Sequence, residues 1–391
     1  MVRRQAVVVV VPISGTMIWL LHALMPGAAF AQDDSGARIE HVAARMAFFE
    51  QTGHGYQSQD GPVGGPGSES LLVFQPIGQI RIAQGDDVTH TVTLPIDIVS
   101  SASADALDAT SSASRDNEAV AFAYDTRVRV GPAWVWSLRS GLHFEEPFWS
   151  ANAGVGVTHS FAENNATLAV SADAILDMFD RLDYEGYDNG ELSRFTGAAN
   201  VSLSQLLSES TLVSGAYGLT WQGGTLEVPY NSVPLTDGTR SGEVFPTHRI
   251  RHALRAEIAQ NIVPTRTTVR LGYRFYVDSF DLFAHTASAQ VYQYIGTRLL
   301  TRASYRFHVQ FGVDFFREAF EPQTVQHGPR TADSDLAPFH AHEAGFMLRY
   351  YFDPILPLDT DSSYIEASFT RYMRSNDLDV NILALAYGQR L

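Results

Sequence analysis

Arginine side chains recur at alternate positions along three neighbouring stretches of the chain, and these rows are the best candidates for chemistry. A guanidinium keeps its charge at any physiological pH, and its planar fork of donors fits a carboxylate or a phosphate group. Alternate residues of a strand share one face, so each row predicts a surface able to bind anions. The rows consist of Arg266, Arg270, Arg274 and Asp278; of Arg302, Arg306, His308, Gln310 and Asp314; and of Arg255 and Glu257, preceded by Arg249 and Arg251.

Two interpretations of these rows stay open at the level of sequence. In the first, the arginines form a ladder along a channel that selects anionic or polar solutes, and facing carboxylates such as Asp97, Asp173 and Asp177 set a transverse electric field at a constriction. In the second, arginines and carboxylates pair within the wall of a barrel and only stabilise it.

The composition excludes several other kinds of chemistry. The 391 residues contain no cysteine, and all 27 basic residues are arginine because no lysine occurs. Thiol nucleophiles, disulfides and cysteine metal sites are therefore absent, as are Schiff bases and the lysine of a phosphate-binding loop. The net charge of −16 argues against a nucleic-acid partner. No dinucleotide fingerprint occurs, and we expect no cofactor.

Two histidine-containing groups could in principle form a metal site or a hydrolase site. His340 and His342 share a strand face next to Glu343, with His327 upstream, and two such histidines could bind zinc or copper. No third ligand has a fixed spacing, so we predict no metal site. His159 and Ser160 are adjacent, as in a hydrolase, but alternation places them on opposite faces. We predict that the protein is not an enzyme.

Alternation of polar and apolar residues shows which elements must carry these rows. In residues 301–316, arginine, histidine and glutamine alternate with tyrosine, phenylalanine and valine, and residues 166–179 alternate in the same way. A period of two indicates β-strands. Sixteen such segments can be read: near 37–51, 71–84, 87–101, 118–130, 133–146, 149–161, 166–179, 194–207, 210–223, 247–262, 265–279, 284–297, 301–316, 340–352, 362–374 and 379–391.

The length of these segments favours a membrane barrel over a soluble sandwich. Soluble strands usually span about 5–6 residues, whereas a tilted strand that crosses a bilayer needs about 9–11. The sequence therefore predicts an all-β, transmembrane, antiparallel up-and-down barrel of about sixteen strands, or fourteen if two segments merge. Its apolar face would contact lipid and its polar face would line the lumen.

The first 31 residues have the pattern of a secretory signal peptide. Arg3 and Arg4 precede an apolar stretch that ends in Ala29-Phe30-Ala31, a typical cleavage site. A single membrane-anchoring helix is the alternative interpretation. We therefore expect a signal peptide over residues 1–31, a barrel over residues 32–391, and a location in the bacterial outer membrane.

Long links rich in Gly, Pro, Ser and Asp alternate with short turns, and the long ones should be extracellular. Aromatic residues near the strand ends suggest girdles at the membrane interfaces. The last strand has apolar residues at alternate positions and resembles the recognition signal of the outer-membrane assembly machinery, although Leu391 stands where an aromatic residue is usual. The long links are residues 52–70, 102–117, 180–193, 222–246, 318–339 and 353–361, and the aromatic residues are Trp134, Trp136, Phe144, Phe148, Trp149, Phe315, Phe316, Tyr350, Tyr351 and Phe352.

Three tracts resemble one family of bacterial outer-membrane barrels that is known only as a domain of unknown function. They cover residues 97–111, residues 200–230 in part, and residues 273–316 in part. The most specific is Tyr273-Arg274-Phe275-Tyr276-Val277-Asp278-Ser279-Phe280, which is similar to a Tyr-Arg-x-Tyr-x-Asp-x-Trp pattern with Phe280 in place of tryptophan. The resemblance implies a barrel without an established activity. It also implies a shared pathway with a periplasmic flavin transferase and a small lipoprotein.

Together these observations predict a porin-like conduit for small polar or anionic solutes. The alternatives are a non-transporting barrel that serves a periplasmic flavin- or redox-linked pathway and, less favoured, an outer-membrane hydrolase. The expected partners are outer-membrane lipid, the assembly machinery and a periplasmic protein or lipoprotein.

Overall fold

The structure is a computed structural model, and it describes residues 36–57, 70–102, 118–145, 148–182, 187–227, 231–325, 328–353 and 363–391. The predicted signal peptide lies outside these residues. In the described part of the chain, no helix is long and apolar enough to cross a membrane.

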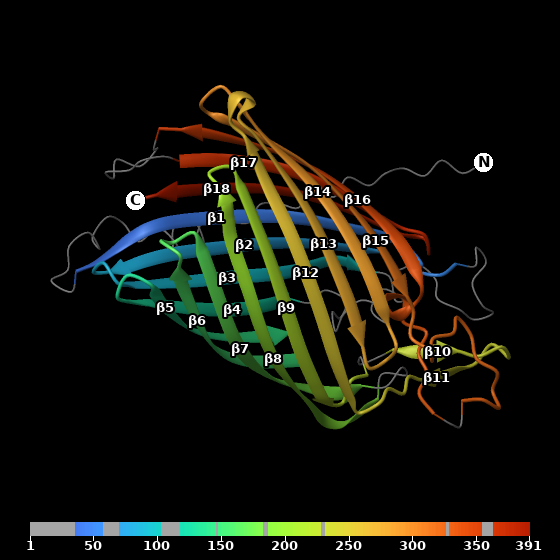
Figure 1. Ribbon diagram of the computed structural model, residues 1–391. Helices are drawn as coiled ribbons and strands as arrows, with labels where there is room; N and C mark the ends of the chain where they lie inside the picture. The colour runs from blue at the N-terminus through green and yellow to red at the C-terminus, as the bar shows by residue number, and fades with distance from the viewer. Residues whose placement is uncertain are drawn as a thin grey trace.

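Sixteen antiparallel strands form a closed barrel, as the sequence predicts (Figure 1). Each strand pairs with its neighbours in the chain order, and β18 closes the sheet against β1. The strands are β1 (Ala37–Gly53), β2 (Leu71–Gln84), β3 (Val88–Ala102), β4 (Glu118–Val130), β5 (Trp134–Glu145), β6 (Phe148–Phe161), β7 (Ala166–Leu182), β8 (Asp188–Ser208), β9 (Thr211–Gly224), β12 (His248–Ile262), β13 (Thr267–Asp278), β14 (Phe283–Ile295), β15 (Leu299–Phe311), β16 (Phe339–Phe352), β17 (Ser363–Arg374) and β18 (Leu378–Arg390).

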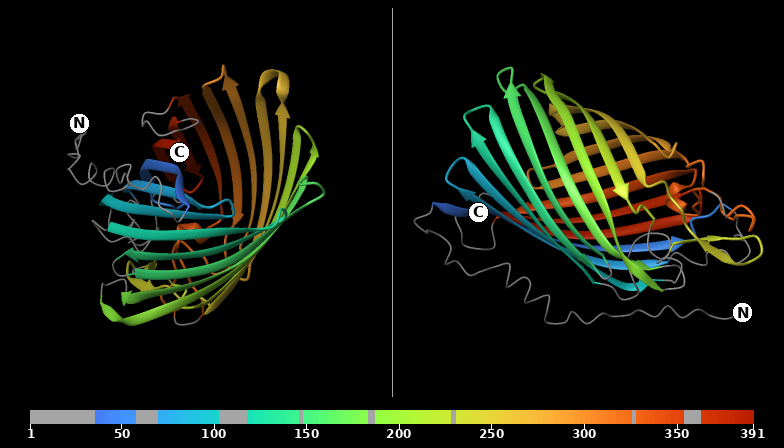
Figure 2. Two further views of the ribbon diagram at one scale, coloured as in Figure 1. Left: turned by 90° about the vertical axis from the view of Figure 1, so that its left-hand side faces the viewer. Right: turned by 90° about the horizontal axis from the view of Figure 1, so that it is seen from below.

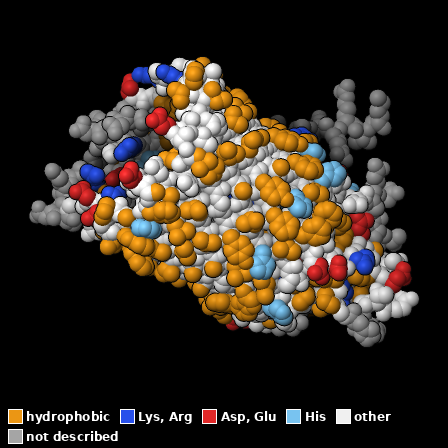
Figure 3. Space-filling view, viewed as in Figure 1, with side chains coloured by type: hydrophobic (Ala, Val, Ile, Leu, Met, Phe, Trp, Pro, Cys, Tyr) orange, Lys and Arg blue, Asp and Glu red, His pale blue; other side chains and the backbone are white. Residues whose placement is uncertain are grey.

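Large apolar side chains cover the outer face of the barrel. Leu138 and Leu254 are 59% and 56% exposed, and Phe346 on β16 is 50% exposed. Figure 3 shows hydrophobic side chains spread over the strands, while acidic and basic side chains gather toward the ends. A barrel surface of this kind suits contact with hydrocarbon, because the closed sheet satisfies its backbone hydrogen bonds internally.

The connections divide between two ends of the barrel. The terminal end, where β1 begins and β18 finishes, faces the viewer in Figure 2 (left). Its turns are short, such as residues 85–87 and 296–298. Strand β16 ends and strand β17 begins at this end, so the connection between them starts and finishes here. Our expectation that every long link lies at the other end is wrong for this one, since an antiparallel barrel sends alternate connections to opposite ends whatever their length.

The opposite end carries a folded loop cap, which we define as the described residues of 225–247, 279–282 and 312–338. It contains the two-stranded sheet of β10 (Ser232–Pro234) and β11 (Arg240–Gly242), which extends beyond the strands in Figure 1. Sequence reasoning predicted only a long loop here.

Two small hydrophobic clusters hold the loop cap together. One packs Phe245, Phe280 and Leu336, with Phe315 and Phe316 against them. These last two phenylalanines are therefore core residues of the cap rather than members of an interface girdle. The other cluster contains Val233, Leu235 and Ala332.

Polar contacts tie segments 225–247 and 312–338 of the cap to each other. Val244 and Arg330 exchange two backbone hydrogen bonds of 3.1 and 2.8 Å. The Arg330 guanidinium donates to the carbonyl oxygens of Gly242 and Val325, at 2.9 and 2.6 Å. Burial lowers the pKa of Arg330 below its ordinary value. The cap is therefore a packed structure with its own core.

We predict that Gly312→Ala opens the loop cap. A Cβ atom at this position would lie 2.7 Å from the nitrogen of Pro338 and 2.8 Å from the carbonyl oxygen of Leu336, so the backbone of residues 336–338 would have to move. Because the chain lacks lysine, trypsin cleaves only after arginine, and we expect faster cleavage after Arg330. Gly242→Ala is the matched control in the same cap, since its Cβ would meet nothing within 4 Å. Equal cleavage rates in the two variants would contradict this account of the packing.

Candidate functional site

The lumen contains two cavities against the wall formed by β8 to β17, with volumes of about 740 and 580 Å³. Both are lined by Arg274, Thr286, His308, Gln310 and Asp335, so they meet at these residues. Five arginines and two carboxylates line the larger cavity, which makes it positively charged. The arginines are Arg255, Arg274, Arg302, Arg306 and Arg374, and the carboxylates belong to Glu343 and Asp335.

Three of the five arginines in the larger cavity form ion pairs. Arg255 donates to Glu257 at 2.6 Å. Arg306 pairs with Glu343 of the neighbouring strand at 2.5 Å. Arg374 reaches the carboxylate of Asp335 at 2.5 Å, and its guanidinium lies over the ring of Phe339, 4.3 Å from the centroid.

Arg274 and Arg302 have no carboxylate partner among the described residues. The guanidinium carbon of Arg274 lies 5.9 Å from the ring of Tyr276, and its side chain is exposed to the cavity. The Nε atom of Arg302 is buried and has no hydrogen-bond partner. These two guanidinium groups therefore have donors left for an anion that enters the cavity.

A short segment of the loop cap reaches into the lumen, where Asp335 lines both cavities. It contains the 3-10 helix η2 (Ser334–Leu336), which Asp333 caps by accepting a hydrogen bond from the backbone of Asp335 at 2.8 Å. Gln310 of the wall donates to the carbonyl oxygens of Asp335 and Ala337, both at 2.8 Å. The Asp335 carboxylate is thus held at the point where both cavities meet.

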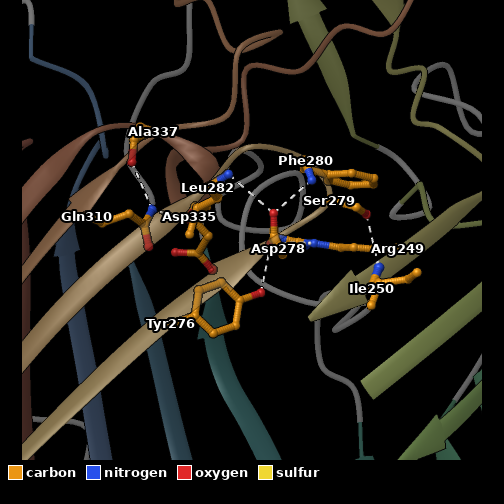
Figure 4. A network of polar contacts seen from close by, with 10 residues as sticks. All are labelled: Arg249, Ile250, Tyr276, Asp278, Ser279, Phe280, Leu282, Gln310, Asp335 and Ala337. Atoms are coloured by element: carbon orange, nitrogen blue, oxygen red, sulfur yellow. Dashed lines mark hydrogen bonds and ion pairs between the residues drawn. The ribbon is translucent and has the colours of Figure 1, made fainter. Parts of the chain in front are cut away.

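Asp278 fixes the end of this wall that adjoins the loop cap (Figure 4). Its carboxylate is fully buried and accepts hydrogen bonds from the Arg249 guanidinium, from the Tyr276 hydroxyl at 2.7 Å, and from the backbone nitrogens of Phe280 and Leu282 at 2.9 and 3.3 Å. The Arg249 guanidinium also lies 4.6 Å from the centroid of the Phe280 ring. One carboxylate thereby joins β12, β13 and the cap.

The structure places the predicted site residues in three different settings. Arg255, Arg270, Arg274, Arg302, Arg306, His308 and Gln310 face the lumen, and all except Arg270 line the cavities described above. Arg270 approaches Glu257 at 3.8 Å.

Three residues predicted to line the pore do not line either cavity. Asp278 is buried in the network of Figure 4. Arg266 lies in the turn after η1 (Val263–Thr265), where it has a φ of 54° and donates to the carbonyl oxygen of Gly296. Asp314 is exposed in the cap, because β15 ends at Phe311, five residues earlier than the alternation suggests. The polar–apolar pattern continues past the strand because the cap has its own buried face.

The three carboxylates predicted to face the arginines are on strands but do not line either cavity. Asp173 accepts from Arg139 at 2.8 Å and Asp177 accepts from Arg194 at 2.8 Å. Asp97 accepts from Gln75 at 2.6 Å. On this side of the barrel Asp173 and Asp177 are compensated by arginines of the wall, whereas Asp97 is hydrogen-bonded to an uncharged amide.

The histidines considered for metal binding or hydrolysis lie on the outer face. His342 accepts or donates a hydrogen bond of 2.7 Å with the Tyr305 hydroxyl, and His340 is exposed beside it. The ring of His159 stacks on Trp134 at 4.0 Å. In the described ranges no group of three potential metal ligands occurs, and His327 lies outside them.

Sequence reasoning missed two residues that shape the site. Arg374 ends the alternating pattern of β17, so its position on the polar face was available as a signal. Asp335 gave no such signal, because it lies in a long loop whose inward path depends on packing of the cap.

Residues 171–382 match the family described as "Protein of unknown function (DUF3570)". A search of curated proteins found no match.

Among solved structures, a bacterial polysaccharide outer membrane secretin is 8% identical, with a TM-score of 0.47 over 89% of this chain and 98% of that one. OpdK of Pseudomonas aeruginosa, crystallised with vanillate, is 8% identical with a TM-score of 0.46 over 91% and 98% of the two chains. The TodX monoaromatic hydrocarbon channel is 10% identical with a TM-score of 0.42 over 92% and 91%. These likenesses concern the barrel fold alone.

We predict that Asp278→Ala loosens the cap without opening the barrel. The substitution leaves Arg249 unpaired and removes the acceptor of two backbone amides, and breaking a buried pair of this kind costs about 3–5 kcal/mol. Hydrogen exchange at Phe280 and Leu282 should accelerate, while the paired amides of β1 and β18 stay protected. Asp314→Ala, which removes an exposed carboxylate, is the control and should change neither. Unchanged exchange in Asp278→Ala would show that the cap does not depend on this carboxylate.

Proposed function

We propose that this chain, which belongs to the DUF3570 family of proteins of unknown function, is a porin-like outer-membrane channel for small polar or anionic solutes. The arginine-lined cavities under the loop cap form its selective region. This role requires no catalytic group.

The outer surface supports the placement in a membrane. Strands of 12 to 21 residues carry large exposed apolar side chains outward and polar ones inward, which is the arrangement of a barrel embedded in lipid. In such barrels, short turns face the periplasm and longer loops face outward. We therefore place the loop cap outside the cell and the terminal end in the periplasm, with residues 1–31 as the export signal.

The observation that carries the proposal is the pair of unpartnered arginines in the larger cavity. Structural ion pairs alone would explain Arg306 with Glu343 or Arg139 with Asp173. They do not explain Arg274 and Arg302, which line the larger cavity and form no ion pair with any described carboxylate. In a wall built only for stability, uncompensated like charges would be unfavourable.

Asp335 gives this region a transverse field. Its carboxylate comes from the loop side, and Arg274, Arg302 and Arg306 come from the barrel wall. Opposed charges across a narrow passage orient a polar solute and favour one sign of ion. We therefore assign to Asp335 the role that the sequence suggests for Asp97, Asp173 and Asp177.

The assembly machinery, the periplasmic flavin transferase and the lipoprotein stay predictions as partners. A barrel that only supports such a pathway would not need to conduct. Purified protein in planar bilayers separates the two roles, because the absence of any ion current would contradict the channel.

We predict that Arg274→Gln combined with Arg302→Gln weakens selection for anions. In a water-filled passage one unit charge at about 6 Å changes the energy of an ion by about 0.7 kcal/mol, or about threefold in its occupancy. The reversal potential of the double variant in a potassium chloride gradient should shift toward zero. Arg298→Gln is the control, because this half-exposed arginine lies in a turn at the terminal end. An open pore with unchanged selectivity in the double variant would refute the proposed role of these arginines.

We predict the opposite shift for Asp335→Asn. The substitution removes the negative charge that faces the wall and releases Arg374, while the contacts of Gln310 with the backbone keep the segment in place. Selection for anions should therefore rise by a factor of about three on the same estimate. The reversal potential in the same gradient measures it, and a shift toward cations would be inconsistent with a field set by Asp335.

A further inference from the structure

Three tyrosine–histidine pairs lie on the outer face of the barrel on the side of the loop cap. The hydroxyl of Tyr217 is 2.7 Å from Nδ1 of His252, and that of Tyr273 is 2.6 Å from Nδ1 of His285. The third pair joins Tyr305 to His342 at 2.7 Å. We refer to His252, His285 and His342 as the histidine belt. Figure 3 shows histidines in a row across the otherwise apolar surface.

The three pairs repeat one geometry. In each, the tyrosine lies opposite a residue two positions beyond the histidine: Tyr217 faces Leu254, Tyr273 faces Ala287 and Tyr305 faces Ala344. The histidines occupy β12, β14 and β16, which are every second strand. A diagonal contact repeated in this way has the character of a built surface feature.

The histidine belt runs level around the barrel. His252 pairs with Val277 of β13, and Val277 pairs with Phe283 of β14, so Phe283 is in line with His252. His285 lies two positions farther from the cap than Phe283. In the same way, His285 pairs with Val309 of β15, and Val309 pairs with His340 of β16, so His340 is in line with His285. His342 lies two positions farther from the cap than His340. A shift of about one residue per strand is what the tilt of barrel strands requires of a ring parallel to the membrane.

Residues on both sides of the belt continue this ring and are typical of a membrane interface. Toward β8, the ring reaches the aromatic pair Phe195 and Trp221, whose centroids are 5.9 Å apart. Toward β18, it reaches the outward Arg371, which pairs with Asp379, and Asn381, which donates to Glu50 of β1. Aromatic rings and outward charges mark the edge of the hydrocarbon region, so the belt lies at that edge.

The hydrogen bonds to tyrosine orient the imidazole rings. A phenol is a stronger acid than a neutral imidazole N–H, so the favourable arrangement has the tyrosine hydroxyl donating to Nδ1. The proton of each neutral ring is then assigned to Nε2. Because Nδ1 is already occupied, Nε2–H is the free donor of each ring, and all three rings are partly exposed.

We propose that the histidine belt binds the phosphate oxygens of lipid headgroups at the cap-side edge of the apolar surface. The site offers N–H donors at the depth where headgroups lie, between aromatic rings that contact the upper acyl chains. His285, for example, has the ring of Phe275 at 5.2 Å, and His342 has that of Phe307 at 5.1 Å. Phosphate oxygens are the strongest hydrogen-bond acceptors at this depth.

The test compares lipids with and without phosphate. Purified protein is exchanged into phosphatidylglycerol or into digalactosyldiacylglycerol, and retained lipid is counted by native mass spectrometry. The wild-type protein should retain phosphatidylglycerol in preference to digalactosyldiacylglycerol. The triple variant His252→Phe, His285→Phe, His342→Phe should lose this preference, by a factor of roughly ten for each charge-assisted hydrogen bond removed. His159→Phe is the control, because this outward histidine has no tyrosine partner and its Nδ1 atom makes no hydrogen bond.

Two outcomes would overturn the proposal. The first is equal retention of phosphatidylglycerol by the wild-type and the triple variant. The second is an equal loss of both lipids in the variant, which would show apolar contact alone. If the triple variant does not fold, Tyr217→Phe with Tyr273→Phe and Tyr305→Phe keeps the rings and removes only the hydroxyl donors. A smaller loss of the preference is then expected, and no loss would count against the proposal. Ion conductance should be unchanged in every folded variant, because these side chains lie outside the lumen.

Discussion

The buried carboxylate of Asp278 is the interaction on which the rest of the site depends. A carboxylate without exposed surface is unfavourable unless its charge is balanced and its oxygens accept hydrogen bonds. Here Arg249 balances the charge, and the Tyr276 hydroxyl and two backbone amides complete the shell. The turn 279–282 is fixed as a result, and Phe280 is directed into the core of the cap. That core includes Leu336, the neighbour of Asp335, so the position of the carboxylate in the lumen follows from the network around Asp278.

The tract from Tyr273 to Phe280 therefore connects three surfaces of the protein. Tyr273 faces outward and binds His285, Arg274 faces the lumen without a carboxylate partner, and Asp278 holds the cap. Alternation along β13 directs the first two to opposite faces, and the end of the strand provides the place for the third. One short strand thus contributes to the lipid-facing surface, to the lumen and to the loop cap.

The two sides of the lumen differ in how their charges are balanced. On β5 to β8, Asp173 and Asp177 each pair with an arginine of a nearby strand. On β12 to β17, arginines exceed carboxylates, and the cap supplies one of the few acidic groups. The two interpretations of the arginine rows thus describe different parts of one barrel. Arginine–carboxylate pairs that stabilise the wall account for β5 to β8, and the proposed selectivity rests on β12 to β17.

Much of the fold follows from the sequence, because a period of two over more than ten residues is a strong local signal. The alternation predicts all sixteen strands, with ends that differ from the observed ones by at most six residues. The lumen-facing positions of Arg274, Arg302 and Arg306 follow from their even-numbered places along their strands. The rule that alternate residues share a face fails where strands end. It cannot show that β15 stops at Phe311, that Asp278 turns into a buried network, or that Asp335 enters the lumen. These features depend on contacts between loops far apart in the chain, for which a single sequence carries no periodic signal.

The central claim is that an anion binds between the wall arginines beneath the loop cap. Anomalous diffraction from crystals soaked in bromide tests it most directly, because bromide can be located without assumptions about a natural solute. We expect bromide in the larger cavity, in contact with Arg274 and Arg302. Bromide bound only at exposed arginines such as Arg298 and Arg317, with the cavity empty of it, would contradict the account.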